Sequence, residues 1–244
     1  MRIIYGINPV LDLLTAKSDE VQKIAIAKGR TGQEIQRVIE LARMHHIAIE
    51  FRTRDDLDAL AGRNSQGLVA FCKQFMYADL EEVIANKQPP FKNGLILILD
   101  SITDPQNMGS LIRTAYFFGA NGVVIPENRS ASVTPVAVKA SSGAAHLLPI
   151  AKVTNLSRAI DELKEAGFWI YGTDAHKGEA VGRADFNRDV GLVMGSEGGG
   201  LRRLTGEKCD LMISIPGTGK FDSLNVSVSA GIILHRIFEV REKV

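Results

Sequence analysis

The chain has 244 residues, of which 45% are hydrophobic and 23% are charged. This is the composition of a soluble globular protein and argues against a disordered one. This length fits one large domain or two modest ones. The formal net charge of +1 gives no global field that would attract a polyanion, so any contact with nucleic acid has to come from local basic patches or from a partner subunit.

The cysteines and the first residues argue against several classes of protein. Cys72 and Cys209 are far apart and form no CxxC unit, which disfavours a disulfide framework and a cysteine-based zinc site. The opening MRIIYGINPVLDLL lacks the pattern of a signal peptide. The longest apolar run, Leu95–Leu99, is much too short to span a bilayer. We therefore expect a cytoplasmic protein with reduced cysteines and no metal.

Residues 1–76 are predicted to form a small α/β unit. Apolar residues recur between 32 and 45 at the i, i+3, i+4, i+7 spacing of an amphipathic helix, and a further helical pattern follows Asn8-Pro9. Short apolar runs predict strands at 23–27, 47–51 and 67–71.

The stretch 77–92 has a different character and is predicted to be a linker. Acidic residues cluster at Asp79, Glu81 and Glu82, where a short helix is an alternative, and Pro89-Pro90 stiffens the exit.

From residue 93 to the end, short apolar runs alternate with helical patterns. This alternation predicts an α/β domain with a mostly parallel sheet covered by helices on both faces. The expected strands are 95–99, 122–126, 168–172, 191–195 and 211–215. The expected helices are 107–118, 135–145, 155–166 and 223–240.

The first stretch that can carry chemistry is LDSITDPQNMGSLIRTAYFFGANGVVIP, from Leu99 to Pro126. Asp104-Pro105 marks a helix start, and Gly119 fits the helix C-terminus. Arg113 lies off the apolar stripe of this helix. It is either a solvated arginine or a group that points into the crevice above the sheet, and Asn107 is either a helix-start residue or part of that site.

The second stretch is GLVMGSEGGGLRRL, from Gly191 to Leu204. Its glycines do not form the GxGxxG dinucleotide fingerprint, and it comes late in the chain. Glu197 would repel a phosphate but suits hydroxyl groups or a cation. A structural turn and a ligand loop both remain possible here.

The third stretch is GTGKFDSLNVSVSAGIILHR, from Gly217 to Arg236. Gly219-Lys220 is followed by phenylalanine where a Walker A loop requires serine or threonine, which argues against a nucleoside triphosphatase. Ser223 is the predicted N-cap of the apolar helix that follows. Asn225 either forms the turn or contacts a ligand.

The three stretches together resemble the three motifs of the SpoU (TrmH-like) family, 2′-O-ribose methyltransferases within the SPOUT superfamily. The matching segments are DPQNMGSLIRTA, VMGSEGGGLRR and ISIPGTGKFDSLNVSVSAGI. The N-terminal YGINPVLDLL and NSQGLVA resemble the family's substrate-binding domain, a ribosomal-protein-like α/β fold. One departure is Ser65, because relatives commonly carry histidine before Gln66-Gly67.

The resemblance implies S-adenosylmethionine as cofactor and 2′-O-methylation of a guanosine in 23S ribosomal RNA as the activity. It also implies a deep trefoil knot in residues 93–244, which the general rarity of knots would otherwise exclude, and a homodimer built through this domain. A tRNA ribose 2′-O-methyltransferase is the alternative within the class. A non-catalytic ribosomal-RNA-binding module for assembly or resistance is the alternative outside it.

The resemblance also assigns site residues. In the family the proton acceptor is the arginine matching Arg113, but because arginine is always protonated a charge-stabilising role is the alternative. The catalytic candidates are Arg113, Asn107, Glu197, Ser223 and Asn225. The cofactor candidates are Gly195, Ile215, Leu224, Thr173, Gly172, Met194, Ser196, Pro216 and Gly219. The RNA-binding candidates are Arg129, Lys139, Arg202, Arg203, Lys220 and Arg63.

Overall fold

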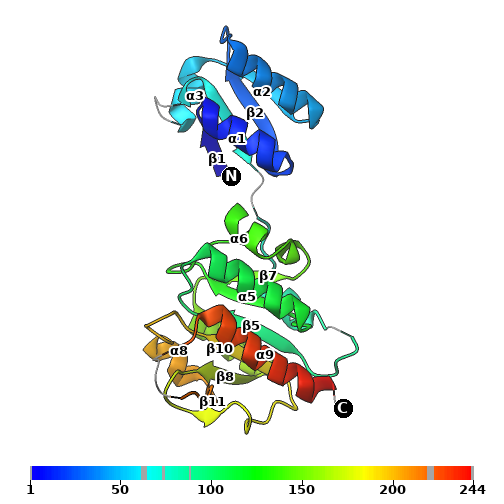
Figure 1. The fold of residues 1–244 in the computed structure, drawn as a ribbon, viewed down its shortest axis with the longest axis vertical. Coiled ribbons are helices and arrows are strands. Elements are labelled where there is room, and N and C mark those ends of the chain that lie inside the picture. Colours follow the sequence, from blue (N-terminus) through cyan, green and yellow to red (C-terminus); the bar gives the residue numbers. More distant parts are fainter. Residues whose placement is uncertain (1, 62–64, 73–74, 88, 219–222, 243–244) are drawn as a thin grey trace. The chain divides into compact units, whose positions relative to one another are not determined.

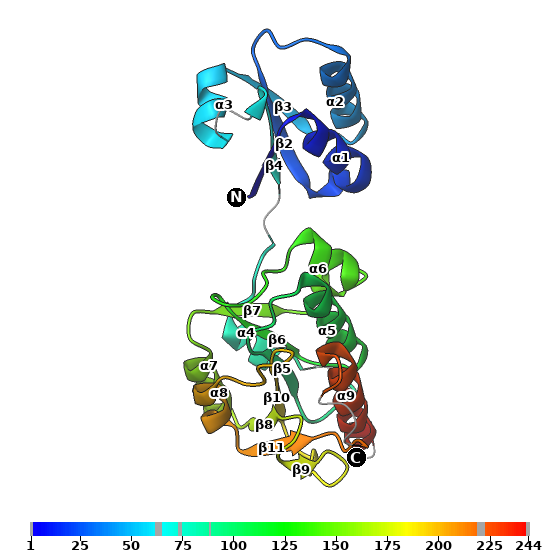
Figure 2. The ribbon, with the colours of Figure 1, turned by 60° about the vertical axis from the view of Figure 1, so that its left-hand side comes forward.

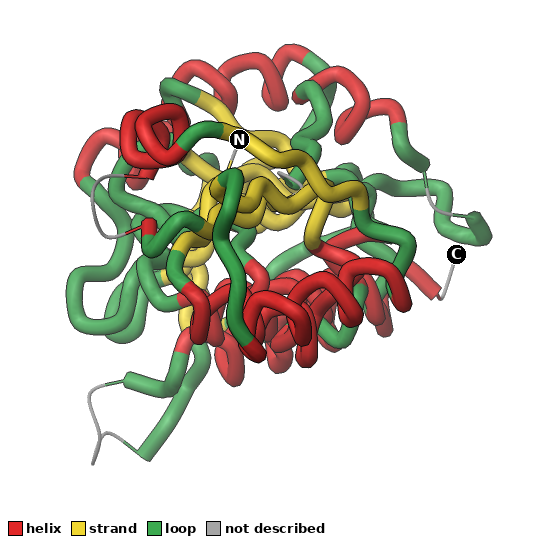
Figure 3. The backbone as a smooth tube through the Cα atoms, turned by 90° about the horizontal axis from the view of Figure 1, so that it is seen from above, coloured by secondary structure: helices red, strands yellow, loops and turns green. Residues whose placement is uncertain are grey.

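The structure, a computed structural model, describes residues 2–61, 65–72, 75–87, 89–218 and 223–242. It divides into two units, Met1–Met76 and Tyr77–Val244, each with its own sheet (Figure 1). Helices pack on the strands in both units. Figure 3 colours these helices red and the strands yellow.

The first unit has a four-stranded sheet in the order β1-β4-β2-β3. β2 and β3 are parallel, whereas β4 is antiparallel to both β1 and β2. The strands are β1 (Arg2–Tyr5), β2 (Val21–Ala27), β3 (Ala48–Arg52) and β4 (Leu68–Cys72). The helices are α1 (Ile7–Lys17), η1 (Ser18–Glu20), α2 (Gln33–Met44) and α3 (Arg54–Ala61).

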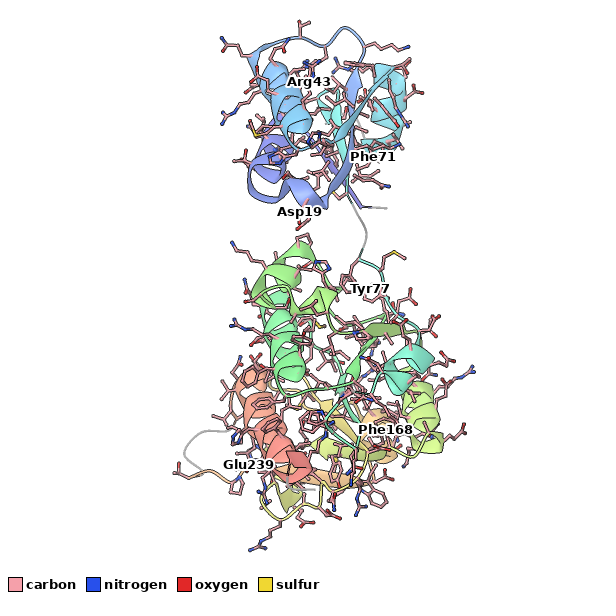
Figure 4. All side chains as sticks on the ribbon, turned by 90° about the vertical axis from the view of Figure 1, so that its right-hand side faces the viewer. Asp19, Arg43, Phe71, Tyr77, Phe168 and Glu239 are labelled. Atoms are coloured by element: carbon pink, nitrogen blue, oxygen red, sulfur yellow. The ribbon has the colours of Figure 1, made fainter. Side chains whose placement is uncertain are left out.

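Both faces of this sheet are covered. α1 and α2 pack on one face in a cluster that includes Ile24 and Leu68, and α3 covers the other face through Leu57. Phe71, labelled in Figure 4, belongs to the second cluster and is fully buried. β1 and α3 were not predicted from the sequence. The helical pattern of α3 contributes only one buried side chain, Leu57, so its periodicity is weak.

The second unit has a seven-stranded sheet in the order β7-β6-β5-β10-β8-β11-β9, and every pairing in it is parallel. The strands are β5 (Leu95–Leu99), β6 (Gly122–Pro126), β7 (Ile150–Val153), β8 (Trp169–Thr173), β9 (Glu179–Ala180), β10 (Val190–Met194) and β11 (Leu211–Ser214). The helices are α4 (Leu80–Ala85), α5 (Pro105–Phe117), α6 (Pro135–Ala140), η3 (Ala144–His146), α7 (Leu156–Glu165), α8 (Arg203–Lys208) and α9 (Val226–Glu242). The expected α/β fold with a parallel sheet is confirmed.

Helices cover both faces of the large sheet. In Figure 2, α4, α7 and α8 lie on one side of the strands, and α5, α6 and α9 lie on the other. Ile96 and Ile98 of β5 pack against α4 and α7 together with Phe168, which Figure 4 labels. Because side chains alternate along a strand, Leu95, Leu97 and Leu99 face α5 and α9. All five residues of β5 are buried, which explains the continuous apolar run LILIL.

The segment 77–92, predicted to be a linker, belongs to the second unit. Its helix α4 carries the exposed Glu81 and Glu82, but Leu80 and Val83 are buried in the core against β6 and β7. The acidic composition therefore concealed a short amphipathic helix. β7, β9 and α8 were also missed, since they have only four, two and six residues.

The helix expected at 135–145 is interrupted. α6 ends at Ala140, and Gly143 has a positive φ of 88° before the short helix η3 begins at Ala144. Ser142 is also left-handed, with a φ of 51°, and left-handed residues end an α-helix because they cannot continue its right-handed backbone. The break places Ser141, Ser142 and Leu147 beside α5, next to the site described below.

Candidate active site

The candidate residues gather at one edge of the large sheet. β5, β10, β8 and β11 are neighbours in the sheet and run parallel, so their carboxyl ends meet at the same edge. The loops that leave these ends contain the residues after Leu99, Thr173, Met194 and Ser214. In open parallel α/β sheets, ligands bind in the crevice outside the carboxyl ends of the strands.

α5 presents its N-terminus to this edge. Asp104 is the N-cap, and its carboxylate accepts from the backbone N–H of Gln106 at 3.0 Å and of Asn107 at 3.4 Å. Pro105 occupies the first helical turn, as the sequence predicted. Gly109 brings α6 close, since a Cβ at this position would lie 2.3 Å from the carbonyl oxygen of Ala137.

Asn107, Glu197 and Asn225 come together from three segments far apart in the chain. Glu197 Oε1 accepts from Asn107 Nδ2 at 3.1 Å, from Asn225 Nδ2 at 2.5 Å and from the backbone N–H of Val226 at 3.2 Å. Asn225 Nδ2 also donates to Asn107 Oδ1 at 3.1 Å. One carboxylate oxygen thus ties the first turns of α5 and α9 to the loop after β10. The polar residues of all three sequence motifs meet in this network.

Asn225, and not Ser223, caps α9. The helix begins at Val226, and Asn225 Oδ1 accepts from the backbone N–H of Ser227 at 2.9 Å and of Val228 at 3.4 Å. The prediction of Ser223 as N-cap is therefore wrong. Both residue types are favoured N-caps, so residue type does not distinguish Ser223 from Asn225, and the backbone geometry selects Asn225. Ser223 is exposed in the loop before the helix.

The glycines of the loop 195–200 serve a tight turn. The backbone N–H groups of Ser196 and Gly200 each donate to the carbonyl of the other, at 3.1 and 3.0 Å. Gly198 and Gly200 have positive φ values of 79° and 60°. A Cβ on Gly195 would lie 2.3 Å from the carbonyl carbon of Gly200, so this position has no room for a side chain. This backbone placement presents Glu197 at the tip of the turn.

A buried ion pair that sequence reasoning missed supports the same loop. Asp100, fully buried directly after β5, accepts from the backbone N–H of Arg202 at 3.0 Å and from its Nε at 2.5 Å. Arg202 therefore has a structural partner, and Arg203 pairs with Glu207 on α8. An acid directly after an apolar strand was the available signal, because a buried carboxylate requires a partner.

Arg113 lies on the exposed side of α5, six residues after Asn107 and about 9 Å further along the helix axis. It lines an open hollow with Tyr116, Phe117 and the segment that begins at Ser141. No carboxylate in the described ranges pairs with it. The structure therefore leaves this cation available to a ligand but does not place it in the network of Asn107.

The described cofactor candidates lie in the last residues of β8 and β10 and in the loops at the same edge. Ile215 is half-buried, whereas Pro216 and Leu224 are exposed, so three apolar side chains lie outside the core in the segment between β11 and α9. Thr173 Oγ1 donates to the carbonyl oxygen of Val193 at 3.0 Å, which joins the ends of β8 and β10. Ser196 lies in the turn after β10, and Met194, the last residue of β10, is buried.

Gly172 is explained by packing of the sheet against α8. A Cβ there would lie 2.6 Å from Met212 Sδ and 2.7 Å from Cys209 Sγ. Burial raises the pKa of the Cys209 thiol to about 12. Just beyond Thr173, the backbone N–H of His176 donates to Asp174 Oδ1 at 2.8 Å and holds the pKa of that carboxyl below its usual value.

The RNA-binding candidates fall into two groups. Arg129 and Lys139 are exposed, and no described side chain forms an ion pair with either of them, in contrast to Arg202 and Arg203. The remaining RNA-binding candidates, Lys220 and Arg63, lie outside the described residues, as does the cofactor candidate Gly219.

Two classes of feature are absent from the described part of the chain. No group of three or more His, Cys, Asp or Glu side chains is placed there to hold a metal ion. None of the described helices is long and apolar enough to cross a membrane.

A parallel α/β sheet with polar and glycine-rich loops at its carboxyl edge defines a class of ligand-binding enzymes, and comparison with known proteins identifies the family. The profile described as "SpoU rRNA Methylase family" matches residues 94–235. The profile described as "RNA 2′-O ribose methyltransferase substrate binding" matches residues 3–78. The chain belongs to the SpoU family, and it is an RNA 2′-O-methyltransferase with an N-terminal substrate-binding domain.

Relatives match over the full length. The chain is 40% identical to the "Putative TrmH family tRNA/rRNA methyltransferase YacO" of Bacillus subtilis, with 99% of this chain and 96% of the relative covered. It is 38% identical to the "23S rRNA (guanosine-2′-O-)-methyltransferase RlmB" of Coxiella burnetii, with 99% and 97% covered. Among solved structures, the SpoU methyltransferase AviRb of Streptomyces viridochromogenes, in complex with S-adenosylmethionine, has a TM-score of 0.65 at 25% identity, with 99% and 91% covered.

Proposed function

We propose that this protein methylates the 2′-hydroxyl of a guanosine in 23S ribosomal RNA. The observation that carries the proposal is the similarity to the Coxiella burnetii RlmB over 99% of this chain and 97% of that protein. A match of this extent includes both the substrate-binding and the methylase parts. The intact polar network of Asn107, Glu197 and Asn225 argues against a non-catalytic binding module.

S-adenosylmethionine is the methyl donor, and it supplies an electrophilic methyl group on a sulfonium. The loops at the carboxyl edge fit such a ligand. They offer backbone hydrogen-bonding groups, the turn at 195–200 and apolar side chains outside the core. The described turn contains no basic side chain before Arg202, so it carries no cation that would repel the sulfonium. The residues that would hold the cofactor are Gly195, Ser196, Ile215, Pro216 and Leu224, with Thr173 and Met194 at the adjoining strand ends.

Arg113 would act on the substrate oxygen as a charge stabiliser. A ribose hydroxyl is too weakly acidic to ionise at neutral pH, so its attack requires a base or a strong stabiliser of the developing alkoxide. A guanidinium is always protonated and cannot accept the proton, but its fixed fork of donors suits a phosphate or an alkoxide. Arg113 is exposed and forms no ion pair with a described residue, which supports this role.

Asn107, Glu197 and Asn225 would hold the site together without touching the methyl group. Their hydrogen bonds fix the starts of α5 and α9 against the turn that faces the cofactor loops. Fixed geometry of this kind is what raises the effective concentration of reacting groups. Ser223, exposed before α9, would contact the cofactor or the target nucleotide.

Phosphate contacts would come from exposed cations. Arg129 follows β6 and Lys139 lies on α6, and neither is engaged by a carboxylate of the described chain.

A homodimer is also part of the proposal. Phe117, Leu147 and Ile232 are 77%, 63% and 40% exposed on α5, after η3 and on α9, and such large apolar side chains favour burial against a second copy. A molar mass in solution equal to that of one chain, measured by light scattering, would exclude the dimer.

Mapping of 2′-O-methylation in total RNA from a strain lacking this protein tests the proposal. We expect a single guanosine of 23S ribosomal RNA to lose its methyl group and to regain it when the chain is expressed again. Loss of a methyl group from tRNA instead would assign the enzyme to the tRNA branch. An unchanged methylation pattern in both RNA classes would contradict the proposal.

A further inference from the structure

An open hollow of about 420 Å³ lies between the first turns of α5 and α9, beside the polar network. Its lining residues are Gln106, Asn107, Ser110, Ala140, Asn225, Ser227 and Val228. None of these side chains is charged. The hollow therefore suits a neutral, flat, polar group better than a phosphate or a sulfonium.

Most of the polar atoms in this hollow are already engaged within the protein. Asn107 and Asn225 use their carboxamides on Glu197, on each other and on the start of α9. Ser227 Oγ donates to Asn107 Oδ1 at 3.3 Å. These groups shape the hollow but have little hydrogen-bonding capacity left for a ligand.

Gln106 is different from the other two carboxamides. Its backbone N–H is bonded to Asp104, but no described residue forms a hydrogen bond with its exposed side chain. A free carboxamide offers a donor and an acceptor side by side, and this pair matches the edge of a nucleobase bidentately. The hydroxyl of Ser110, one turn further along α5, is also unbonded among the described residues.

The position of Gln106 relative to Arg113 supports a nucleic-acid ligand. Gln106, Ser110 and Arg113 follow the i, i+4, i+7 spacing, so they lie along one face of α5 within about 10 Å. Ala140 and Val228 add apolar surface on which a flat base can rest. An RNA strand whose ribose or phosphate reaches Arg113 thereby has room for one base in the hollow.

We infer that Gln106 binds the edge of a nucleobase of the substrate RNA through its carboxamide. This inference rests on the proposed function, because it requires RNA as the substrate. The base belongs either to the methylated nucleotide or to a neighbour, since both lie within reach of Arg113. Gln106 is in this account a positioning residue for the substrate.

A double-mutant cycle between protein and RNA tests the contact. The full-length protein and its Gln106→Ala variant are assayed on ligated RNAs that carry one abasic ribonucleotide at a time, at the methylated guanosine or at a flanking position. An abasic nucleotide keeps its 2′-hydroxyl, so methyl transfer remains possible. We expect Gln106→Ala to lower kcat/KM about tenfold on intact RNA, mostly through KM, and to leave the affinity for S-adenosylmethionine unchanged.

At one position the abasic substitution should lower the activity of the wild type by a similar factor and leave the Gln106→Ala variant unaffected. That position identifies the bound base as the target or its neighbour. The matched control is Gln36→Ala, which removes an exposed carboxamide from α2. The abasic substitution should lower the activity of this variant by the same factor as that of the wild type. If the wild type is active and the losses from Gln106→Ala and from the abasic substitution add at every position, the inference about Gln106 is wrong, whereas the proposed function still stands. A wild type that methylates none of the RNAs overturns the proposed function, and this inference with it.

Discussion

Replacement of Glu197 is expected to loosen the junction between α5, α9 and the loop after β10. Alanine removes three hydrogen bonds to Oε1, at 3.1, 2.5 and 3.2 Å. Because Glu197 is exposed and water can replace the lost partner, we take the lower end of the usual range, about 0.5 kcal/mol for each bond and about 1.5 kcal/mol in total. For a unit of this size the loss corresponds to a decrease in Tm of about 3–6 °C.

Glutamine at the same position separates charge from hydrogen bonding. Its carbonyl oxygen still accepts from Asn107 and Asn225, but the negative charge near the N-terminus of α9 is lost. That charge is worth about 0.5 kcal/mol at an exposed helix end. We therefore expect the order of Tm to be wild type, then Glu197→Gln, then Glu197→Ala.

The assay uses the fluorescence of Trp169, the single tryptophan, which lies on β8 and reports the second unit alone. Glu207→Ala is the matched control, because among the described residues its carboxylate pairs with Arg203 alone, on the surface, and contributes about 0.5 kcal/mol or less. Equal Tm values for Glu197→Ala and the wild type, or a larger loss for the glutamine variant than for alanine, would refute the assigned network.

Three further predictions concern the loops around the site. Gly195→Ala should weaken binding of S-adenosylmethionine at least about tenfold by calorimetry, because its Cβ would meet backbone at 2.3 Å, whereas Gly206→Ala, with nothing within 4 Å, should leave binding unchanged. Arg202→Ala should lower the stability of the second unit by about 2 kcal/mol, because the buried Asp100 keeps the backbone N–H of residue 202 but loses its cationic partner. Lys139→Ala should leave stability unchanged and lower the salt slope of RNA binding by about one. The opposite assignment of the two effects would contradict the ion-pair analysis. Cys209, whose pKa is raised to about 12, should resist iodoacetamide at pH 8 in the native protein and react after unfolding. Since its pKa in the native protein lies above the value in the unfolded chain, its contribution to stability is present below about pH 8.5 and is lost as the pH rises toward 12. Rapid alkylation of the native protein would contradict this burial.

The elements with long buried patterns were predictable from the sequence. β5 and β6 occupy the expected ranges because each is an uninterrupted run of buried apolar residues, and α5 begins at the expected Asp104-Pro105. The weak elements were missed because their buried residues are few. β9 has two residues at the sheet edge, and α4 has two buried residues hidden among acids.

The sequence predicted which residues belong to the site better than it predicted the contacts between them. Asn107, Glu197 and Asn225 were all candidates, but the sequence does not show that a single carboxylate oxygen joins them. The acid directly after an apolar strand indicated that Asp100 needs a partner, but the sequence does not identify Arg202 as that partner, because the two are 102 positions apart. The trefoil knot and the roles of the individual cofactor-binding residues stay predictions from the family resemblance.

The most direct test of the account is methyl transfer by the purified protein to unmodified 23S ribosomal RNA with radiolabelled S-adenosylmethionine, compared with its Arg113→Ala variant. Arg113 is exposed and pairs with no described carboxylate, so the variant should retain the Tm of the wild type. We predict that the wild type places one methyl group on a guanosine 2′-oxygen and that Arg113→Ala loses at least about a hundredfold in kcat. Equal activity in the variant, or a methyl group on a base, would contradict the account.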